Sequence, residues 1–354
     1  TTRPAPLEYD WSRIDSLIDA AAPYGIRIQL TLTGPAPAWA AANRRVGVFG
    51  PNPDSFGDFA RAAATHFKGR VDRYSIWNEP NYISWLQPFD LNAALYRELY
   101  VSAYKQIKRA DKKAQVLIGE TAPYAIKKRS TAPLAFLRNV TCTRTTVKTT
   151  AGSGTDPTPD TTVPARARVH SAAVSSKPPV LLRGGCKPLV TDGFAHHPYD
   201  YRHRPDYAYK GTDNATLGSI GRLSGTLSAL AKLGALRTPK GKAAPIFLTE
   251  YGYFASGKYA LPDTARSAYL KKAYTIAQRD PAVVQLLQYG LVAPPPSDLG
   301  AYFDLSLVAA DGTPGFAFDG LAAWAQTAAG RGQIVPPGVA ITLPPAPQDR
   351  GHKH

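Results

Sequence analysis

The stretch YSIWNEPNY at residues 74–82 joins a short apolar run to an asparagine, a glutamate and a proline. The run VDRYSIW (71–77) has the length and the apolar content of a buried strand. Pro80 cannot donate a hydrogen bond to a sheet and disfavours helical geometry in the residue before it. We therefore expect a strand that ends here, with Glu79 in extended geometry and its carboxyl group presented beside Asn78.

Five further apolar runs have the same character and are separated by stretches with helical spacing. They are IRIQLTL (26–32), QVLIG (115–119), LVTDGFA (189–195), PIFLTE (245–250) and VVQLLQYGLV (283–292). One of the helical stretches places apolar residues at Phe56, Phe59, Ala60, Ala63 and Phe67, which form a single stripe on a helix. Alternation of helices with short apolar strands is typical of a parallel sheet covered by helices.

Two architectures show this alternation, a doubly wound open sheet and a (β/α)8 barrel. The open sheet usually carries a glycine-rich phosphate turn after an early strand, and neither GxGxxG nor GxxxxGK[ST] occurs in the chain. Polar and aromatic residues instead collect where strands end, as in barrel enzymes. These residues are Trp39, Asn78, Glu79, Glu120, His197, Tyr199 and Glu250. We predict an α/β fold of the (β/α)8 TIM-barrel class. The first two strands of such a barrel are not evident in the chain, so either they are missing or the barrel closes by other means.

Residues 141–188 interrupt the pattern, being rich in Thr, Ser, Pro and Gly and poor in large apolar side chains. We expect a long insertion before strand six, within a catalytic barrel domain at residues 1–332, and a role for it in covering the cleft is one interpretation. Cys142 and Cys186 are the two cysteines of the chain. We predict a disulfide between them, with two unrelated buried thiols as the alternative. The proline-rich residues 333–354 are expected to form a C-terminal tail or linker.

The composition describes a globular, basic protein. Lys and Arg number 42 against 26 Asp and Glu, a net charge of +16, which favours an anionic partner or simply serves solubility. No zinc-finger spacing or aromatic-rich basic cluster supports nucleic-acid binding. No run approaches the roughly 18 apolar residues of a membrane span. The chain contains no methionine and no signal sequence at Thr1, so we expect a processed or shortened product.

A second glutamate changes the interpretation of the first. Glu250, in FLTEYGY (247–253), also ends an apolar run. Alone, Glu79 could equally be an exposed acid in a turn, but two glutamates at separate strand ends can face each other across a barrel mouth. Cleavage of a glycosidic bond needs such a pair, one carboxyl to protonate the leaving oxygen and one carboxylate to attack the anomeric carbon. Mutual repulsion and partial burial would separate their pKa values.

The set WNEP (77–80), HPY (197–199) and TEYG (249–252) resembles the clan A retaining glycoside hydrolases. LTLTGPAPAWA (30–40) and GFAHHPYDY (193–201) look most like family 39 and its bacterial cellulase-like relatives. Those enzymes are (β/α)8 barrels with an Asn-Glu acid/base after strand four and a glutamate nucleophile after strand seven. The resemblance implies that Glu79 is the general acid/base, Glu250 the nucleophile, and Asn78 a ligand of the sugar 2-hydroxyl.

Further residues are candidates for substrate binding. His197 and Tyr199 are two apart on an extended segment, so both can face the pocket, where Tyr199 could hydrogen-bond the nucleophile. His196 would then face away from them. Trp39 is either a stacking platform for a sugar ring or a core residue. Glu120 belongs to substrate binding or to a salt bridge, and no residue spacing implies a metal.

We predict a secreted or cell-surface bacterial glycoside hydrolase that acts on a poly- or oligosaccharide through a covalent intermediate. An anionic or envelope-derived glycan is a candidate substrate, because the chain is basic. The alternative is a carbohydrate-binding or cell-envelope protein that keeps the cleft and lacks catalysis. We expect a monomer whose partner is carbohydrate, with no nucleic acid, cofactor or metal.

Overall fold

The computed structural model describes residues 8–145, 181–293, 303–336, 338, 340 and 342–347. At its centre lies a six-stranded sheet in which all neighbouring strands run parallel. The strand order is β1 (Gln29–Leu32), β2 (Arg73–Ile76), β3 (Gln115–Thr121), β7 (Gly193–His196), β9 (Ile246–Tyr251) and β10 (Val283–Gln288). The six predicted runs supply these strands, although the run at 189–195 divides. Its first part, β6 (Leu189–Val190), pairs instead with β8 (Leu236–Arg237).

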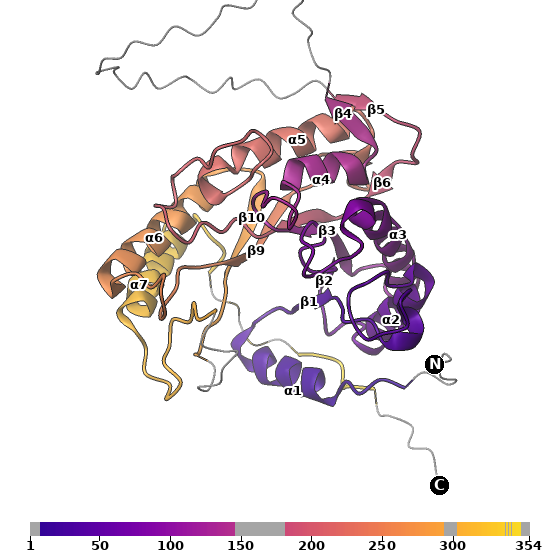
Figure 1. Cartoon of the computed structure of the whole chain (residues 1–354). Coiled ribbons are helices and arrows are strands. Elements are labelled where there is room, and N and C mark those ends of the chain that lie inside the picture. Colours follow the sequence, from indigo (N-terminus) through magenta and orange to yellow (C-terminus); the bar gives the residue numbers. More distant parts are fainter. Residues whose placement is uncertain are drawn as a thin grey trace, which may run out of the picture.

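Helices follow the strands along the chain and flank the sheet in Figure 1, with α2 and α3 beside one half and α5, α6 and α7 beside the other. The helices are α1 (Ser12–Ala21), α2 (Pro53–His66), α3 (Asn92–Ala110), α4 (Pro133–Val140), α5 (Gly221–Lys232), α6 (Asp263–Arg279) and α7 (Phe316–Gly330). Short 3-10 segments are η1 (Ala22–Tyr24), η2 (Ala38–Ala40), η3 (Phe89–Leu91) and η4 (Leu217–Ser219). Helix α2 begins after Asn52, whose side chain caps it by accepting a hydrogen bond from the Ser55 amide over 2.8 Å.

The sheet curls until its two edge strands share an interior. On β2, Arg73 donates to Gln285 of β10 over 2.6 Å and to Gln115 of β3 over 2.9 Å. Gln285 in turn donates to Gln29 of β1 over 3.3 Å. Since β1 and β10 stand at opposite ends of the strand order, these side chains can meet only if the sheet wraps around them. A curled parallel sheet of the (β/α)8 class is the result.

Apolar side chains continue this interior toward the carboxyl ends of the strands. Leu117, Ala195 and Phe247 form a buried cluster, and the Arg73 guanidinium lies 4.2 Å from the centre of the Phe247 ring. Within the described residues, β1 and β10 pair on one side each. Closure by two further strands therefore stays a prediction.

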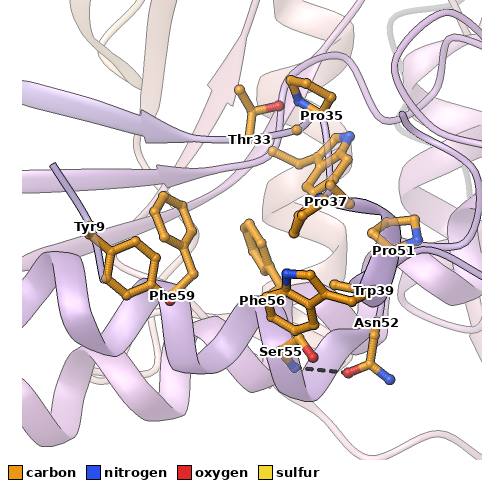
Figure 2. Close-up of a pocket in the computed structure, with 14 residues that line it drawn as sticks. Tyr9, Thr33, Pro35, Pro37, Trp39, Pro51, Asn52, Ser55, Phe56 and Phe59 are labelled. Atoms are coloured by element: carbon orange, nitrogen blue, oxygen red, sulfur yellow. Dashed lines mark hydrogen bonds between the residues drawn. The ribbon is translucent and has the colours of Figure 1, made fainter. Parts of the chain in front are cut away.

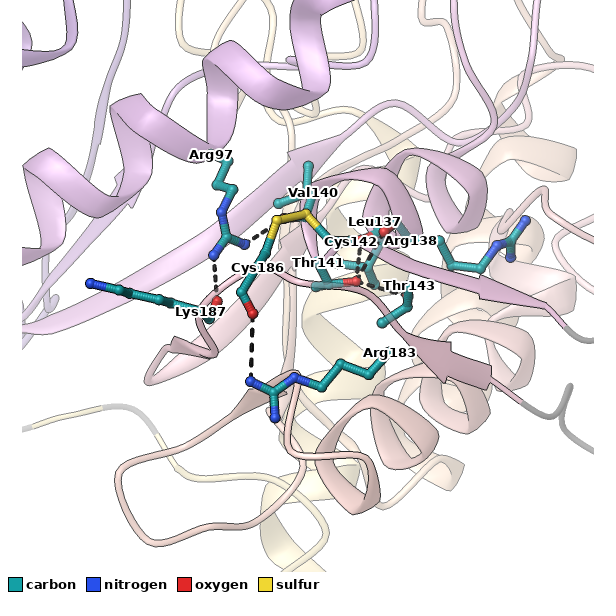
Figure 3. Close-up of a disulfide and its surroundings, with 10 residues drawn as sticks. All are labelled: Arg97, Leu137, Arg138, Val140, Thr141, Cys142, Thr143, Arg183, Cys186 and Lys187. Atoms are coloured by element: carbon teal, nitrogen blue, oxygen red, sulfur yellow. Dashed lines mark hydrogen bonds between the residues drawn. A yellow bond between two sulfur atoms is a disulfide. The ribbon is translucent and has the colours of Figure 1, made fainter.

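The disulfide between Cys142 and Cys186 is present, as predicted, with Cα atoms 5.8 Å apart (Figure 3). It joins the ends of the insertion beside an antiparallel pair, β4 (Thr143–Thr145) and β5 (Leu181–Arg183). Arg97 of α3 donates to the Val140 carbonyl over 2.7 Å and also to the Lys187 carbonyl, which fixes both ends to the barrel wall. Residues 146–180 lie outside the described part, and with them the predicted covering of the cleft.

Part of the predicted C-terminal tail lies against the body of the protein. Leu343 packs on the main core, and the Pro344 ring lies beside Gly69. The domain boundary at residue 332 stays a prediction. Over the ranges described here, no helix is long and apolar enough to cross a membrane.

Candidate active site

A cavity of about 700 Å³ opens at the carboxyl ends of the central strands. Four of the predicted site residues line it, namely Asn78, Glu79, Tyr199 and Glu250. Asn78 and Glu79 follow β2, Tyr199 follows β7, and Glu250 lies near the end of β9. The parallel strands therefore deliver these side chains to one place, as the sequence predicts.

The backbone that presents Glu79 differs from the expected extended geometry. Strand β2 ends at Ile76, and Trp77 and Glu79 have φ angles of 65° and 36°, in the left-handed region. The surroundings explain this: the Glu79 amide donates to the Glu120 carbonyl over 2.8 Å, and the buried Trp77 indole donates to the Trp85 carbonyl over 2.8 Å. Such backbone strain costs about 1 to 3 kcal/mol and is typical of functional sites. Here it turns the Glu79 carboxyl toward the cavity.

His197 lies between three carboxyl groups. Its Nδ1 is 3.1 Å from Oε1 of Glu79 and 3.5 Å from Oε2 of Glu250. Its Nε2 is 2.6 Å from Oε2 of Glu120. The imidazole is 1% exposed, so these contacts are shielded from water. The two glutamates of the predicted pair therefore share one ring nitrogen.

The charges of this cluster shift one another's titration. Burial alone would lower the pKa of His197, but Glu250 and the bonds with Glu120 and Glu79 outweigh it and hold the pKa well above its usual range. Burial raises the pKa of Glu250, while the His197 charge partly offsets that rise. The Tyr199 hydroxyl also favours the ionised form, because it donates to Oε2 of Glu250 over 3.1 Å.

Glu120 does not line the cavity and is 1% exposed. It accepts hydrogen bonds from His197, from Thr249 Oγ1 over 2.6 Å and from Thr31 Oγ1 over 3.2 Å. Of the two alternatives left open for it, this geometry matches the salt bridge rather than contact with a substrate. Thr31 and Thr249 were not singled out from the sequence; the available signal was a threonine near the carboxyl end of each of two mostly apolar strands.

His196 faces away from the cavity, as predicted. Its Nε2 donates to the Ala215 carbonyl over 2.5 Å, and its Nδ1 accepts from Thr121 Oγ1 over 2.8 Å. Burial lowers the pKa of His196 to about 4. It is a neutral residue with both ring nitrogens satisfied, and its role is structural.

Trp39 lies outside this cavity, in a neighbouring pocket of about 210 Å³. Figure 2 shows this aromatic pocket, whose wall includes Tyr9, Phe56 and Phe59. Thr33 lines both the aromatic pocket and the main cavity, so the two adjoin. The structure thus separates Trp39 from the other predicted site residues while keeping it near them.

No protein-family signature and no curated protein matches the chain. Solved structures do match. A family 39 glycoside hydrolase from Bacteroides cellulosilyticus aligns with a TM-score of 0.59 and 18% identity, over 90% of this chain and 54% of that one. Xylanase 10B from Thermotoga maritima aligns with a TM-score of 0.52 and 14% identity, over 92% and 82%. A family 39 β-xylosidase from Caulobacter crescentus aligns with a TM-score of 0.50 and 16% identity, over 93% and 60%.

The fold is similar to that of these glycoside hydrolases, and the highest of the three TM-scores belongs to a family 39 enzyme. This confirms, for the fold, the resemblance carried by WNEP, HPY and TEYG. The chain spans 54% and 60% of the two family 39 enzymes. In this fold, the polar residues at the strand ends form the cavity wall, which is where barrel enzymes place their chemistry.

Proposed function

We propose that this protein is a retaining glycoside hydrolase that cleaves O-glycosidic bonds of a poly- or oligosaccharide by double displacement. One observation carries the proposal: Glu79 and Glu250 both reach Nδ1 of His197, at 3.1 and 3.5 Å. Retaining enzymes hold their two carboxyl groups about 5 to 5.5 Å apart, whereas inverting enzymes need roughly 6.5 to 9.5 Å to admit a water. Contact of both groups with one atom supports the shorter separation.

Each carboxyl group has its own role in this mechanism. Glu250 attacks the anomeric carbon, and Glu79 first protonates the leaving oxygen and then deprotonates the incoming water. Tyr199 and His197 both approach Oε2 of Glu250, so we assign the attack to Oε1. Because burial raises the pKa of Glu250, these two neighbours are needed to keep the nucleophile ionised.

Asn78 is proposed to orient the sugar at the scissile bond. Its backbone N–H donates to Thr33 Oγ1 over 3.2 Å, which fixes the residue in the cavity wall next to Glu79. The side-chain amide offers both a donor and an acceptor to a sugar 2-hydroxyl. A contact that tightens as the ring flattens contributes to the rate rather than to ground-state binding alone.

The setting of the site suggests which substrates to try first. The cavity of about 700 Å³ exceeds one sugar ring, and fold neighbours include a β-xylosidase and a xylanase. We propose a β-linked glycan, with anionic glycans added to the screen because the net charge is +16. The disulfide supports a secreted or cell-surface location, where such bonds persist. We propose that the protein is a monomer and that one barrel domain, at residues 1–332, carries its activity.

Trapping of the covalent intermediate tests the function directly. The protein is incubated with 2-deoxy-2-fluoro β-xylosyl, β-glucosyl and β-glucuronosyl fluorides and then digested. The masses of its peptides are measured by mass spectrometry. The expected result is one sugar added to the peptide that contains Glu250. A label on another carboxylate contradicts the assignment. Absence of label with all three, together with binding of xylan or an anionic glycan, favours the alternative of a catalytically inactive carbohydrate-binding protein.

A further inference from the structure

Glu120 contacts the proposed acid/base in two ways. Its carbonyl accepts the Glu79 amide over 2.8 Å, and its carboxylate holds Nε2 of His197, whose Nδ1 contacts the Glu79 side chain. The backbone is shaped for this. Glu120 has a φ of 50°, and the pairing of β3 with β7 shifts register between Gly119 and Thr121. A bulge of this kind re-aims one side chain of a strand, here into the barrel interior.

The Glu120 carboxylate is enclosed and well supplied with donors. It accepts bonds from His197, Thr249 and Thr31. Burial alone would raise the pKa of Glu120, but the bond and the charge of His197, helped by Thr249, outweigh it and hold the pKa below its usual range. A buried carboxylate that stays ionised requires a charged or strongly polar partner, and His197 is in the place of that partner.

Two adjacent histidines separate the effect of burial from the effect of charge. His196 and His197 are both fully buried. His196 faces a hydroxyl and a backbone carbonyl, and burial lowers its pKa to about 4. His197 faces three carboxyl groups, and its pKa lies well above the usual range. Since burial is the same for both rings, the carboxyl groups account for the difference.

The chemistry of the donors fixes the direction of each bond. An ionised carboxylate cannot donate, so Nε2 of His197 must donate to Glu120. A neutral imidazole would then offer only a lone pair at Nδ1, which one of the two cavity carboxyls would have to satisfy with a proton. An imidazolium instead donates from Nδ1 to Glu79 and places its positive charge 3.5 Å from Oε2 of Glu250. The charge of His197 therefore decides how many protons the Glu79 and Glu250 pair carries.

We propose that Glu120 is a positioning residue that keeps His197 as an imidazolium, with its Nδ1–H directed at Glu79 and Glu250. It thereby places a hydrogen-bond donor and a positive charge beside both carboxyl groups of the proposed catalytic pair. This consequence for catalysis rests on the proposed function, whereas the protonation of His197 does not. The other titratable groups around the cluster are neutral, because burial lowers the pKa of the histidine and raises those of the tyrosines: His196, Tyr96, Tyr199 and Tyr201.

Nuclear magnetic resonance of ¹⁵N-histidine-labelled protein tests the proposal on the full chain. The His197 ring signals are assigned by their loss in His197→Gln. In the wild type, both ring nitrogens are expected to stay protonated well above pH 6.5, the ordinary histidine value. In Glu120→Gln the titration should move down by about 1 to 3 pH units, the usual effect of losing one adjacent opposite charge. Glu98→Gln, the same change at an exposed position of α3, is the matched control and should leave the titration of His197 unchanged.

Activity gives a second readout. In Glu120→Gln the alkaline limb of the pH profile of kcat/KM should move to lower pH, because His197 loses its proton earlier. The acidic limb should not rise, because the Glu120 charge raises the pKa of Glu250 and its removal acts in the opposite direction. Glu120→Asp, which retains a carboxylate, should return the alkaline limb toward its wild-type position, whereas a role in packing alone would change the rate without moving that limb.

The outcomes separate this inference from the proposed function. A wild-type His197 that titrates at or below pH 6.5 overturns the inference without the need for any variant. An unmoved His197 titration in folded Glu120→Gln also overturns it, even if hydrolysis is detected. A shifted titration in a protein that hydrolyses none of the glycosides refutes the glycosidase function and leaves the pairing of Glu120 with His197 in place.

Discussion

The hydroxyl of Tyr199 donates a hydrogen bond to Oε2 of Glu250 over 3.1 Å. The residues are 51 positions apart and meet because β7 and β9 are neighbours in the sheet. Burial raises the pKa of Glu250, and the Tyr199 bond opposes that rise. The proposed nucleophile thus depends on a neighbouring strand for its charge.

Removal of this donor should displace the pH profile. In Tyr199→Phe the pKa of Glu250 rises further, and since the nucleophile reacts when ionised, the acidic limb of kcat/KM moves to higher pH. A hydrogen bond to a charged group contributes about 1.5 to 3 kcal/mol, which corresponds to a loss of roughly 10- to 150-fold. Tyr259→Phe, at an exposed tyrosine, is the control. A slower enzyme with an unmoved acidic limb would argue against this role.

The two carboxyl groups should respond differently to azide. Glu79→Ala is expected to lose roughly 10²- to 10⁴-fold on glycosides whose leaving group needs a proton, and little on dinitrophenyl glycosides. Azide should then restore turnover and give a glycosyl azide with the anomeric configuration of the substrate. Glu250→Ala forms no covalent intermediate, so any azide product should be inverted. Proton nuclear magnetic resonance of the products distinguishes them, and the reverse pattern would exchange the two roles.

The fold class and the cavity carboxyls follow from local pattern in the sequence. Each central strand is a short apolar run, and parallel strands joined by helices bring all their carboxyl ends to one edge. Glu79 and Glu250 therefore had to share a neighbourhood once their strands were recognised, and the HPY segment on β7 had to lie with them. The disulfide was predictable too, because the two cysteines lie close to the ends of one insertion.

Other features depend on contacts between distant segments and could not be derived in this way. The left-handed φ of Glu79 accompanies a hydrogen bond from its amide to the carbonyl of Glu120, which lies 41 positions later in the chain. A rule that considers only the residue before a proline does not include this distant contact. The burial of Glu120 depends on the register shift between β3 and β7. Trp39 follows a loop that places it in the aromatic pocket. The periodicity of apolar residues does not specify the direction that such a loop takes.

The aromatic pocket should matter for long substrates only. Trp39→Ala removes one face of a pocket of about 210 Å³ that adjoins the cavity at Thr33. Loss of one stacking contact, about 1 kcal/mol, should lower kcat/KM for a β-linked tetrasaccharide about fivefold and leave that for a nitrophenyl monosaccharide unchanged. Phe316→Ala, at an exposed position of α7, is the control. An equal loss on both substrates would assign Trp39 to packing.

Removal of the disulfide should lower stability without affecting the chemistry. The Cys142 to Cys186 bond spans 44 positions, and a chain-entropy estimate gives about 4 kcal/mol for a loop of that length. The double variant Cys142→Ser with Cys186→Ser should show this loss in denaturant unfolding. Reductant should produce the same loss in the wild type and none in the double variant. Because the bond lies outside the cavity, kcat/KM under native conditions should be retained; a large loss would place the insertion in the site.

His196 should make the folded state sensitive to acid. Burial lowers its folded pKa to about 4, against about 6.5 in an unfolded chain. Above pH 6.5 both states are neutral and the full stability is present. Between pH 6.5 and 4, His196 is protonated in the unfolded chain and neutral in the folded protein. The free energy of unfolding therefore falls by roughly 3 kcal/mol over this range and then levels off.

The comparison of wild type with His196→Gln isolates this contribution. Urea unfolding is measured at pH 7 and at pH 4 for both proteins, and for His203→Gln at a partly exposed histidine as the control. The glutamine side chain has no titration in this range, so the variant should lose less stability than the wild type between the two pH values, by roughly the same 3 kcal/mol. Equal losses in the wild type and His196→Gln would show that His196 accepts a proton without unfolding, contrary to its contacts with Ala215 and Thr121.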